Sequence, residues 1–294
     1  MANADDGQAT ADQTAAMIAA VAPATLVAPD ASTLTAAVSG EIVQLPGSAG
    51  GVVTVSHGPE ASADDQALPV VTVSLPHEVQ AKQGQRAQDG TVVYASSGPV
   101  DAAVQVLADQ SVRLETVVKS GKRQQKFTYT FTGAVPQLQK DGSVNLVATK
   151  DSGSVKAQAI VAQIAPAWAV DAKGKPVSTS YRVTKKGELV QKVKPGKNAA
   201  YPIVTDPQVS VRWFGAEFYL NKNETNNAGY GAALYGIIGG AALFWVPPAA
   251  AAVAAVGGAY AATAAWAQGA GMCLKITWTP VLIYPSRYSG GNCR

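Results

Sequence analysis

Short runs of β-branched and other apolar residues, separated by turn residues, recur along the chain from about Glu41 to Asp206. Within most runs the apolar side chains follow a period of two, which is the pattern of a strand with one buried face. No segment between the runs has the period of an amphipathic helix. About a dozen strands at this spacing predict a mainly β domain, either an antiparallel sandwich or a rolled sheet. Typical turn pairs between the runs are Gly58-Pro59, Asp89-Gly90, Gly98-Pro99 and Asp141-Gly142.

The β-rich region ends at Thr205-Asp206-Pro207, where proline stops the last strand and the composition changes. Alternating residues then predict one further strand that continues to Leu220. Asn221 and Glu224 have the spacing of a capping box, which predicts that a helix begins there.

A helical hairpin is expected after this cap. The first helix runs to about Trp245, because Pro247-Pro248 interrupt it, and the second runs from Pro248 to about Gln268. A strand from Cys273 to Thr279 follows. These elements predict a small C-terminal α+β domain built on the hairpin.

The length of 294 residues also favours two domains. The predicted organisation is an acidic low-complexity arm over 1–40 with one short helix at Thr10–Val21, a β-rich scaffold domain over 41–206, and a strand, hairpin and strand domain over 207–294.

Charge is distributed unevenly along the chain. Residues 1–81 contain nine carboxylates and no lysine or arginine. We expect most of the acidic arm to be mobile unless it packs on the body of the protein. Docking on a basic surface would depend on salt, whereas docking through the apolar stripe around Ile18 would not.

A run of 50 residues from Thr225 to Leu274 contains no charged residue. Each expected helix within it is of bilayer length, and an uncharged helix must be covered by protein or by lipid. The hairpin therefore predicts either membrane insertion and self-assembly or a permanently buried structural role. The residues expected to carry packing or insertion are Ala232, Gly236 and Gly240 as a ridge of small residues, with Trp245 and Trp266 as interface anchors.

A second interaction surface is expected between Lys173 and Lys197. Eight basic residues in this segment accompany one acid, Glu188, which gives a local net charge of +7. Such a surface either contacts an anionic envelope polymer, lipid headgroups or the acidic arm, or is a solvated sheet face. We call these eight residues the basic face: Lys173, Lys175, Arg182, Lys185, Lys186, Lys192, Lys194 and Lys197.

The two cysteines, Cys273 and Cys293, lie 20 residues apart in one segment, without a CxxC motif or a nearby histidine. This use of cysteine predicts a disulfide and an exported protein, with two unrelated buried thiols as the alternative. Ala2-Asn3-Ala4 after Met1 has the small-x-small pattern that signal peptidase leaves, although no signal peptide is present in the chain. An ordinary alanine-rich terminus explains the same residues. We expect a secreted, extracellular location.

Several segments resemble uncharacterised secreted proteins of actinomycete bacteria. In the β-rich region the resemblance rests on Gly90–Tyr94, Ala103–Val106, Ala165–Ala172 and the Tyr-Pro-x-x-x-Asp-Pro segment at Tyr201–Pro207. In the C-terminal region it rests on Tyr219–Thr225, the Gly/Ala-rich hairpin and Gly271–Ile276. The resemblance implies export and transfers no activity.

The residue inventory argues against the common enzyme classes. The only two histidines, His57 and His77, lie in turn contexts, and no Gly-x-Ser-x-Gly elbow is present. The chain also lacks a phosphate-binding Gly-Lys-Thr or Gly-Lys-Ser sequence and a zinc-ligand set. Glu217, alone on an aromatic strand, is the one carboxylate worth inspecting. We expect no enzyme activity, no cofactor and no nucleic-acid partner.

Two hypotheses follow from the sequence. The first is a membrane-active or self-assembling, toxin-like effector that acts through the hairpin. The alternative is a cell-envelope structural or protein-binding module in which the hairpin is permanently buried and the basic face makes contacts. A homo-oligomer or a protein partner is compatible with either hypothesis.

Overall fold

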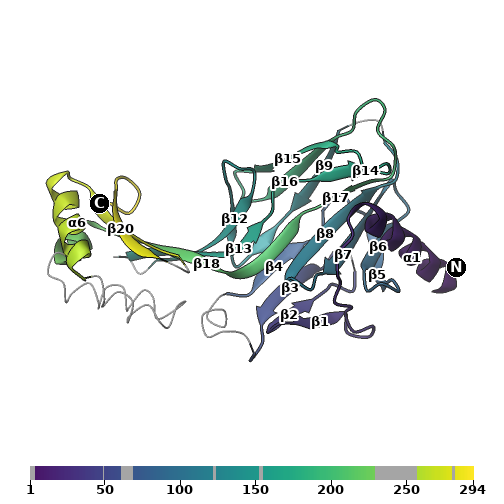
Figure 1. Cartoon of the computed structure of the whole chain (residues 1–294), viewed down its shortest axis with the longest axis horizontal. Coiled ribbons are helices and arrows are strands. Elements are labelled where there is room, and N and C mark those ends of the chain that lie inside the picture. The colour runs from purple at the N-terminus through teal and green to yellow at the C-terminus, as the bar shows by residue number, and fades with distance from the viewer. Residues whose placement is uncertain are drawn as a thin grey trace. The chain divides into compact units, whose positions relative to one another are not determined.

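The structure is a computed structural model, which describes residues 4–48, 50–60, 69–121, 124–151, 155–228, 257–279 and 282–294 (Figure 1). It confirms that the chain is mainly β, with antiparallel sheets. The chain divides into two compact units. Unit 1 contains 1–61, 70–146 and 163–211, and unit 2 contains 62–69, 147–162 and 212–294.

The first sheet of unit 1 is a meander to which a later strand is added. Its order is β1 (Thr35–Val38), β2 (Glu41–Gln44), β3 (Val52–His57), β4 (Val71–Ser74) and β10 (Phe131–Thr132). Ser39 and Gly40 between β1 and β2 both have positive φ, as a two-residue hairpin turn requires. β1 lies within the predicted acidic arm, so the end of that arm is a strand.

A second antiparallel sheet carries the core of unit 1. It contains β5 (Ala81–Arg86), β6 (Val92–Ser96), β7 (Val100–Val106) and β8 (Ser111–Val118), and β8 also pairs with β17 (Ile203–Thr205) and with the first residues of β18 (Gln208–Leu220). β14 (Ala169–Asp171) pairs with β17, and β11 (Val135–Leu138) pairs with β12 (Val144–Asp151). β7 and β8 are buried along their whole length.

Helix α1 (Ala4–Val21) covers one face of this second sheet. Its stripe of Ala11, Ala15 and Ile18 packs on buried side chains that include Val93 and Val117. The helix is longer than the predicted Thr10–Val21. The arm is expected to be mobile unless it packs on the body, and this helix does pack, because its stripe buries apolar surface on the sheet.

A three-stranded sheet in unit 1 has the order β15 (Ser178–Val183), β16 (Leu189–Lys194) and β9 (Gln125–Tyr129). Its inward residues are apolar or aromatic and include Phe127, Tyr129 and Leu189, all fully buried. Residues at intervening positions, among them Lys126, Arg182 and Lys194, are exposed. The alternation expected from the sequence therefore places the charged residues of this sheet outward.

Unit 2 is a sheet covered by helices on one face. Its strand order is β12, β13 (Val155–Ile164), the later part of β18, β19 (Cys273–Trp278) and β20 (Ile283–Tyr288). Helices α3 (Lys222–Ala228) and α6 (Gly257–Gly269) pack on each other, on β19 and, for α6, on β20. The side chain of Asn221 accepts a hydrogen bond from the backbone N–H of Glu224, so the predicted N-cap is confirmed.

Candidate anion-binding face

The basic face lies on the three-stranded sheet of unit 1 and on its loops. Arg182 lies on β15, and Lys192 and Lys194 lie on the neighbouring strand β16. The other members are in loops: Lys173 and Lys175 between β14 and β15, Lys185 and Lys186 at the β15–β16 turn, and Lys197 after β16.

The strand pairing places like charges opposite one another. Lys192 of β16 is paired with Lys126 of β9, so the structure adds Lys126 to the basic face. Side chains at directly opposed positions lie about 5 Å apart at Cβ, and two like charges there are destabilising. A local pattern in the sequence indicates the direction of this residue, because the apolar neighbours Phe127 and Tyr129 require Lys126 to point outward. No local pattern indicates that its strand pairs with β16, which lies much later in the chain.

The acids nearest to these lysines are engaged elsewhere. Glu188, the one acid of the segment, accepts a hydrogen bond of 3.0 Å from the Thr184 hydroxyl within its own turn. Asp171 accepts backbone N–H bonds from Ala200, Lys175 and Lys173. The bonds from Ala200 and Lys175 lower the pKa of Asp171 most, so its charge stabilises the loop that carries the lysines.

The basic face therefore has little internal neutralisation. In the part of the chain that the structure describes, salt bridges join Arg113 to Glu115, Lys119 to Asp101 and Lys275 to Glu217. None of these includes a member of the basic face.

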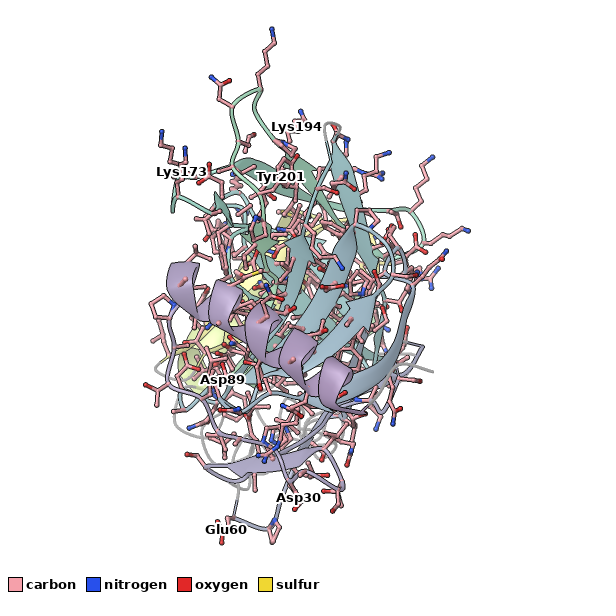
Figure 2. The ribbon with its side chains drawn as sticks, turned by 90° about the vertical axis from the view of Figure 1, so that its right-hand side faces the viewer. Asp30, Glu60, Asp89, Lys173, Lys194 and Tyr201 are labelled. Atoms are coloured by element: carbon pink, nitrogen blue, oxygen red, sulfur yellow. A yellow bond between two sulfur atoms is a disulfide. The ribbon has the colours of Figure 1, made fainter. Side chains whose placement is uncertain are left out.

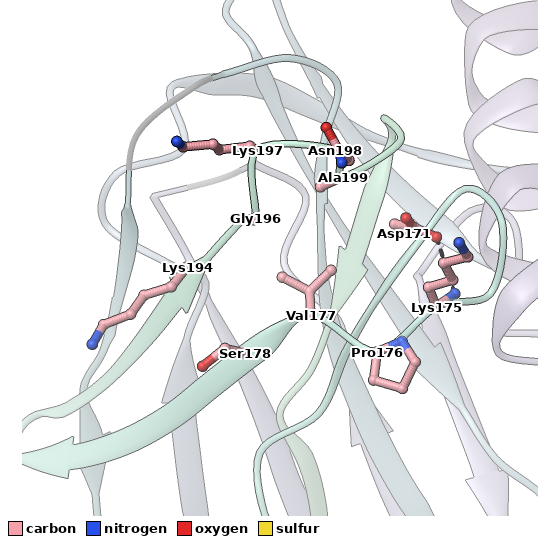
Figure 3. Close-up of a pocket in the computed structure, with 10 residues that line it drawn as sticks. All are labelled: Asp171, Lys175, Pro176, Val177, Ser178, Lys194, Gly196, Lys197, Asn198 and Ala199. Carbon is pink, nitrogen blue, oxygen red and sulfur yellow. Dashed lines mark hydrogen bonds between the residues drawn. The ribbon is translucent and has the colours of Figure 1, made fainter.

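A surface pocket of about 440 Å³ opens at one end of the basic face (Figure 3). Val177 points into the pocket, while Lys194 and Lys197 extend on one side and Lys175 lies on the opposite side beside Asp171. Ser178 and Asn198 add hydrogen-bonding groups to the lining. The pocket thus combines cationic side chains and neutral polar groups with one carboxylate, Asp171, whose oxygens accept backbone N–H bonds. The cations and neutral polar groups are of the kind that bind phosphate or carboxylate groups.

Some of the basic and acidic residues of unit 1 lie far from one another. Figure 2 shows Lys173 and Lys194 at one end of the unit and Asp30 and Glu60 at the opposite end. Asp12 of α1 accepts hydrogen bonds from the backbone and side chain of Gln88, not from the basic face. Of the docking modes considered for the acidic arm, the described helix therefore uses the apolar stripe around Ile18 and not the basic segment.

The predicted disulfide is present. Cys273 and Cys293 are bonded to each other across 20 residues, and the bond joins the first residue of β19 to the C-terminal loop. The structure has a strand, β20, where the sequence indicated only a tail.

The predicted hairpin residues lie mostly outside the described residues. This holds for Ala232, Gly236, Gly240 and Trp245, whereas Trp266 is described and lies near the end of α6. Its ring is exposed on one side, and the Arg287 guanidinium carbon lies 3.1 Å from the ring centroid. Among the described helices, none combines the length and the apolar character that crossing a membrane requires.

Comparisons with known proteins add no assignment. Neither a protein-family model nor a curated protein sequence matches the chain.

Proposed function

We propose that the protein is an exported, non-enzymatic binding protein whose basic face holds a linear polyanion of the cell envelope. The observation that carries this proposal is a surface with net positive charge, bearing a pocket, whose neighbouring acids are engaged in local turns. The cations run from the Lys185-Lys186 turn to Lys197, past a hairpin whose six-residue strands are about 20 Å long. This length favours a polymer over a single small anion.

The predominance of lysine over arginine in the basic face favours a flexible polymer as the ligand. Seven of the eight predicted members are lysines, which act as point charges, and only Arg182 offers the planar fork that reads a fixed anion geometry. The outward strand residues Ser178, Ser180 and Thr128 are small and polar, so the face lacks the aromatic platform on which nucleic-acid bases stack. A phosphate-bearing wall polymer fits this surface better than single-stranded nucleic acid.

The proposal also includes an extracellular location and a β-sandwich scaffold that carries the basic face. The Cys273–Cys293 bond is of the kind that persists outside the reducing cytoplasm. A sandwich arrangement of unit 1 is supported by hydrogen bonds from the three-stranded sheet to its neighbour, such as Gln191 Nε2 to Asp206 Oδ1 at 3.2 Å. A scaffold of this kind holds the lysines in fixed positions.

The membrane-active hypothesis stays a prediction of the sequence, since most of its residues lie outside the described part of the chain. It is kept as an outcome of the test below.

The test measures binding of the purified protein to a poly(glycerol phosphate) chain by fluorescence anisotropy. We expect the double variant Lys192→Gln/Lys194→Gln to bind about tenfold more weakly or worse. The matched control, Lys140→Gln/Lys222→Gln, removes two exposed lysines that are not members of the basic face and should bind like the wild type. Equal weakening by both pairs would leave net charge as the only cause. Dye leakage from anionic vesicles without polymer binding would favour the membrane-active hypothesis instead.

A further inference from the structure

The sheet of unit 2 has one face that the described helices do not cover. Leu274, Ile276 and Trp278 of β19 are buried on the face where Arg287 of β20 meets Trp266 of α6. The residues between them in β19, together with their paired partners, point to the other face. These are Glu217 and Tyr219 of β18, Lys275 and Thr277 of β19, and Tyr284, Ser286 and Tyr288 of β20. We call this set the tyrosine face.

A pocket of about 270 Å³ lies at one end of the tyrosine face. Its lining combines two half-buried aromatic rings, Tyr219 and Tyr288, with the side chains of Lys156 and Gln158 from β13 and with the loop Ser289–Asn292. All of these residues belong to unit 2. Aromatic rings with a few polar groups around them are the usual lining of a small-molecule site.

Hydrogen bonds at the hydroxyl groups hold both rings in place. The Tyr288 hydroxyl donates to the backbone carbonyl of Leu220 at 2.7 Å, and the Tyr219 hydroxyl donates to Glu217 Oε2. The ring centroids are 5.1 Å apart and nearly perpendicular. Because the hydroxyls are engaged, the rings offer mainly their carbon surface to the pocket.

Glu217 organises this end of the face. Burial alone would raise the pKa of Glu217, but hydrogen bonds from Lys275 and Tyr219 outweigh it and lower the pKa below the ordinary value. The Lys275 Nζ lies 2.7 Å from Glu217 Oε1. The carboxylate that the sequence singled out therefore holds Tyr219 and Lys275 and is not a free acid facing water.

The loop that closes the pocket is also fixed. Cys293 at its end is bonded to Cys273, and the Asn292 side chain donates to the backbone carbonyl of Tyr219 at 2.8 Å. Gly290 and Gly291 in this loop both have positive φ, which glycine adopts without strain. A preformed pocket loses less conformational entropy when a ligand binds.

We propose that this pocket binds one acidic sugar unit of a glycan. The C–H groups of a sugar ring are weakly positive and favour the negative face of an aromatic ring, which Tyr219 and Tyr288 provide. The hydroxyls of the sugar need amide and hydroxyl partners, which Gln158 and Ser289 provide. Lys156 adds a positive charge that matches a carboxylate on the sugar.

A proline-rich peptide is the other ligand that aromatic pockets commonly accept. Such peptides dock in elongated grooves lined by aromatic rings. Here the two rings are perpendicular, and the loop Ser289–Asn292 lines the pocket beside them. This shape favours a compact sugar ring over an extended peptide.

The glycan site goes beyond the proposed polyanion binding and uses different residues. Its test is therefore made in a Lys192→Gln/Lys194→Gln background, which weakens the basic face, with disaccharides as probes. We expect a uronic-acid disaccharide to bind more tightly than its neutral counterpart, measured by calorimetry. Poly(glycerol phosphate) contains no sugar ring, so failure of one experiment does not decide the other.

Three substitutions separate the contributions. Tyr288→Ala should weaken binding of the acidic disaccharide about tenfold or more, whereas Tyr288→Phe keeps the ring and should stay within about threefold. Lys156→Gln should make the acidic and neutral sugars bind equally. Tyr284→Ala, on the same face but outside the pocket lining, is the control and should change nothing.

The proposal is overturned if neither disaccharide binds, if a proline-rich peptide binds in their place, or if Lys156→Gln leaves the preference for the acidic sugar unchanged. Lys156→Gln keeps the test valid if Tyr288→Ala fails to fold, because it replaces a partly exposed lysine with a neutral side chain of similar length.

Discussion

Arg113 Nη1 lies 3.5 Å from Glu115 Oε1 beneath helix α1, and both side chains are almost fully buried. Arg113 also donates to the carbonyl of Ala22 just after the helix, at 3.0 Å, where the helix dipole favours a positive charge. Its guanidinium carbon lies 5.9 Å from the centroid of the Trp168 ring. The pair thus fixes the end of α1 to the central sheet of unit 1.

Buried carboxyl groups in unit 1 predict that stability falls as pH rises. Burial raises the pKa of Glu115 to about 8, against the attraction of Arg113, and burial raises the pKa of Asp206 to about 7. Between the ordinary pKa and the raised one, the folded state holds a proton that the unfolded chain has released. The stability that these two groups contribute is therefore fully present below about pH 4 and is lost as pH rises towards 8, by up to about 1.4 kcal/mol per pH unit for each group.

Urea unfolding at pH 5, 6.5 and 8 tests this linkage. Glu115→Gln is neutral at every pH, so its stability should fall less steeply, and it should exceed the wild type at pH 8. Glu60→Gln, which replaces an exposed carboxylate, should keep the wild-type slope. Parallel curves for the wild type and Glu115→Gln would show that Glu115 is already ionised in the folded protein at pH 5.

Because α1 docks through apolar contacts, loss of one such contact should destabilise unit 1, and salt should not release the helix. Ile18 is fully buried in the stripe, so Ile18→Ala should destabilise unit 1 by about 2–5 kcal/mol. Limited proteolysis should cut within residues 4–34 faster in this variant. The exposed Gln13→Ala is the control. Release of the wild-type helix by molar salt would mean that charge, and not burial, holds it.

The backbone conformation of the turn at Asp89-Gly90 predicts that a side chain at Gly90 destabilises unit 1. Gly90 has a φ of +96°, and a Cβ there would lie 2.8 Å from the Cα of Ala28. Gly90→Ala should therefore destabilise unit 1 by about 1–3 kcal/mol in a thermal melt. Gly98 has no such φ and only one neighbouring atom, Ser96 Oγ at 3.5 Å, so Gly98→Ala should be nearly neutral. Equal melting temperatures for the two variants would contradict the described turn.

The disulfide predicts a difference in both mass and stability. Without reductant the intact protein should be two hydrogens lighter than the reduced form, and alkylation should label no thiol. Cys293→Ser should destabilise unit 2 by about 3 kcal/mol, the loop-closure value for a ring of this size. Two thiols that alkylate freely in the untreated protein would remove this support for export.

The sequence predicted the features that depend on local chemistry. The strand β8, the cap at Asn221 and the Cys273–Cys293 bond all follow from neighbouring residues or a short spacing. Arg113 and Glu115 look solvent-facing in the same pattern, because they alternate with Val112 and Leu114. They are buried because α1 covers their face, which is information from a distant part of the chain.

The features of the fold that the sequence did not predict depend on which strands pair with one another. β5 (Ala81–Arg86) is polar and lacks an apolar alternation, and it is a strand because it pairs with β6. Lys126 joins the basic face only because β9 pairs with β16. The pocket at Tyr219 and Tyr288 likewise requires β13, β18 and β20 to lie in one sheet, which no short motif indicates.

The salt dependence of polymer binding tests the central claim most directly. If the basic face binds a polyanion by charge, the logarithm of its affinity for poly(glycerol phosphate) falls linearly with the logarithm of the salt concentration, because bound counterions are released. Lys192→Gln/Lys194→Gln should then show a shallower slope than the wild type, and Lys140→Gln/Lys222→Gln the wild-type slope. An affinity independent of salt, or one slope shared by all three proteins, would contradict polyanion binding at this face.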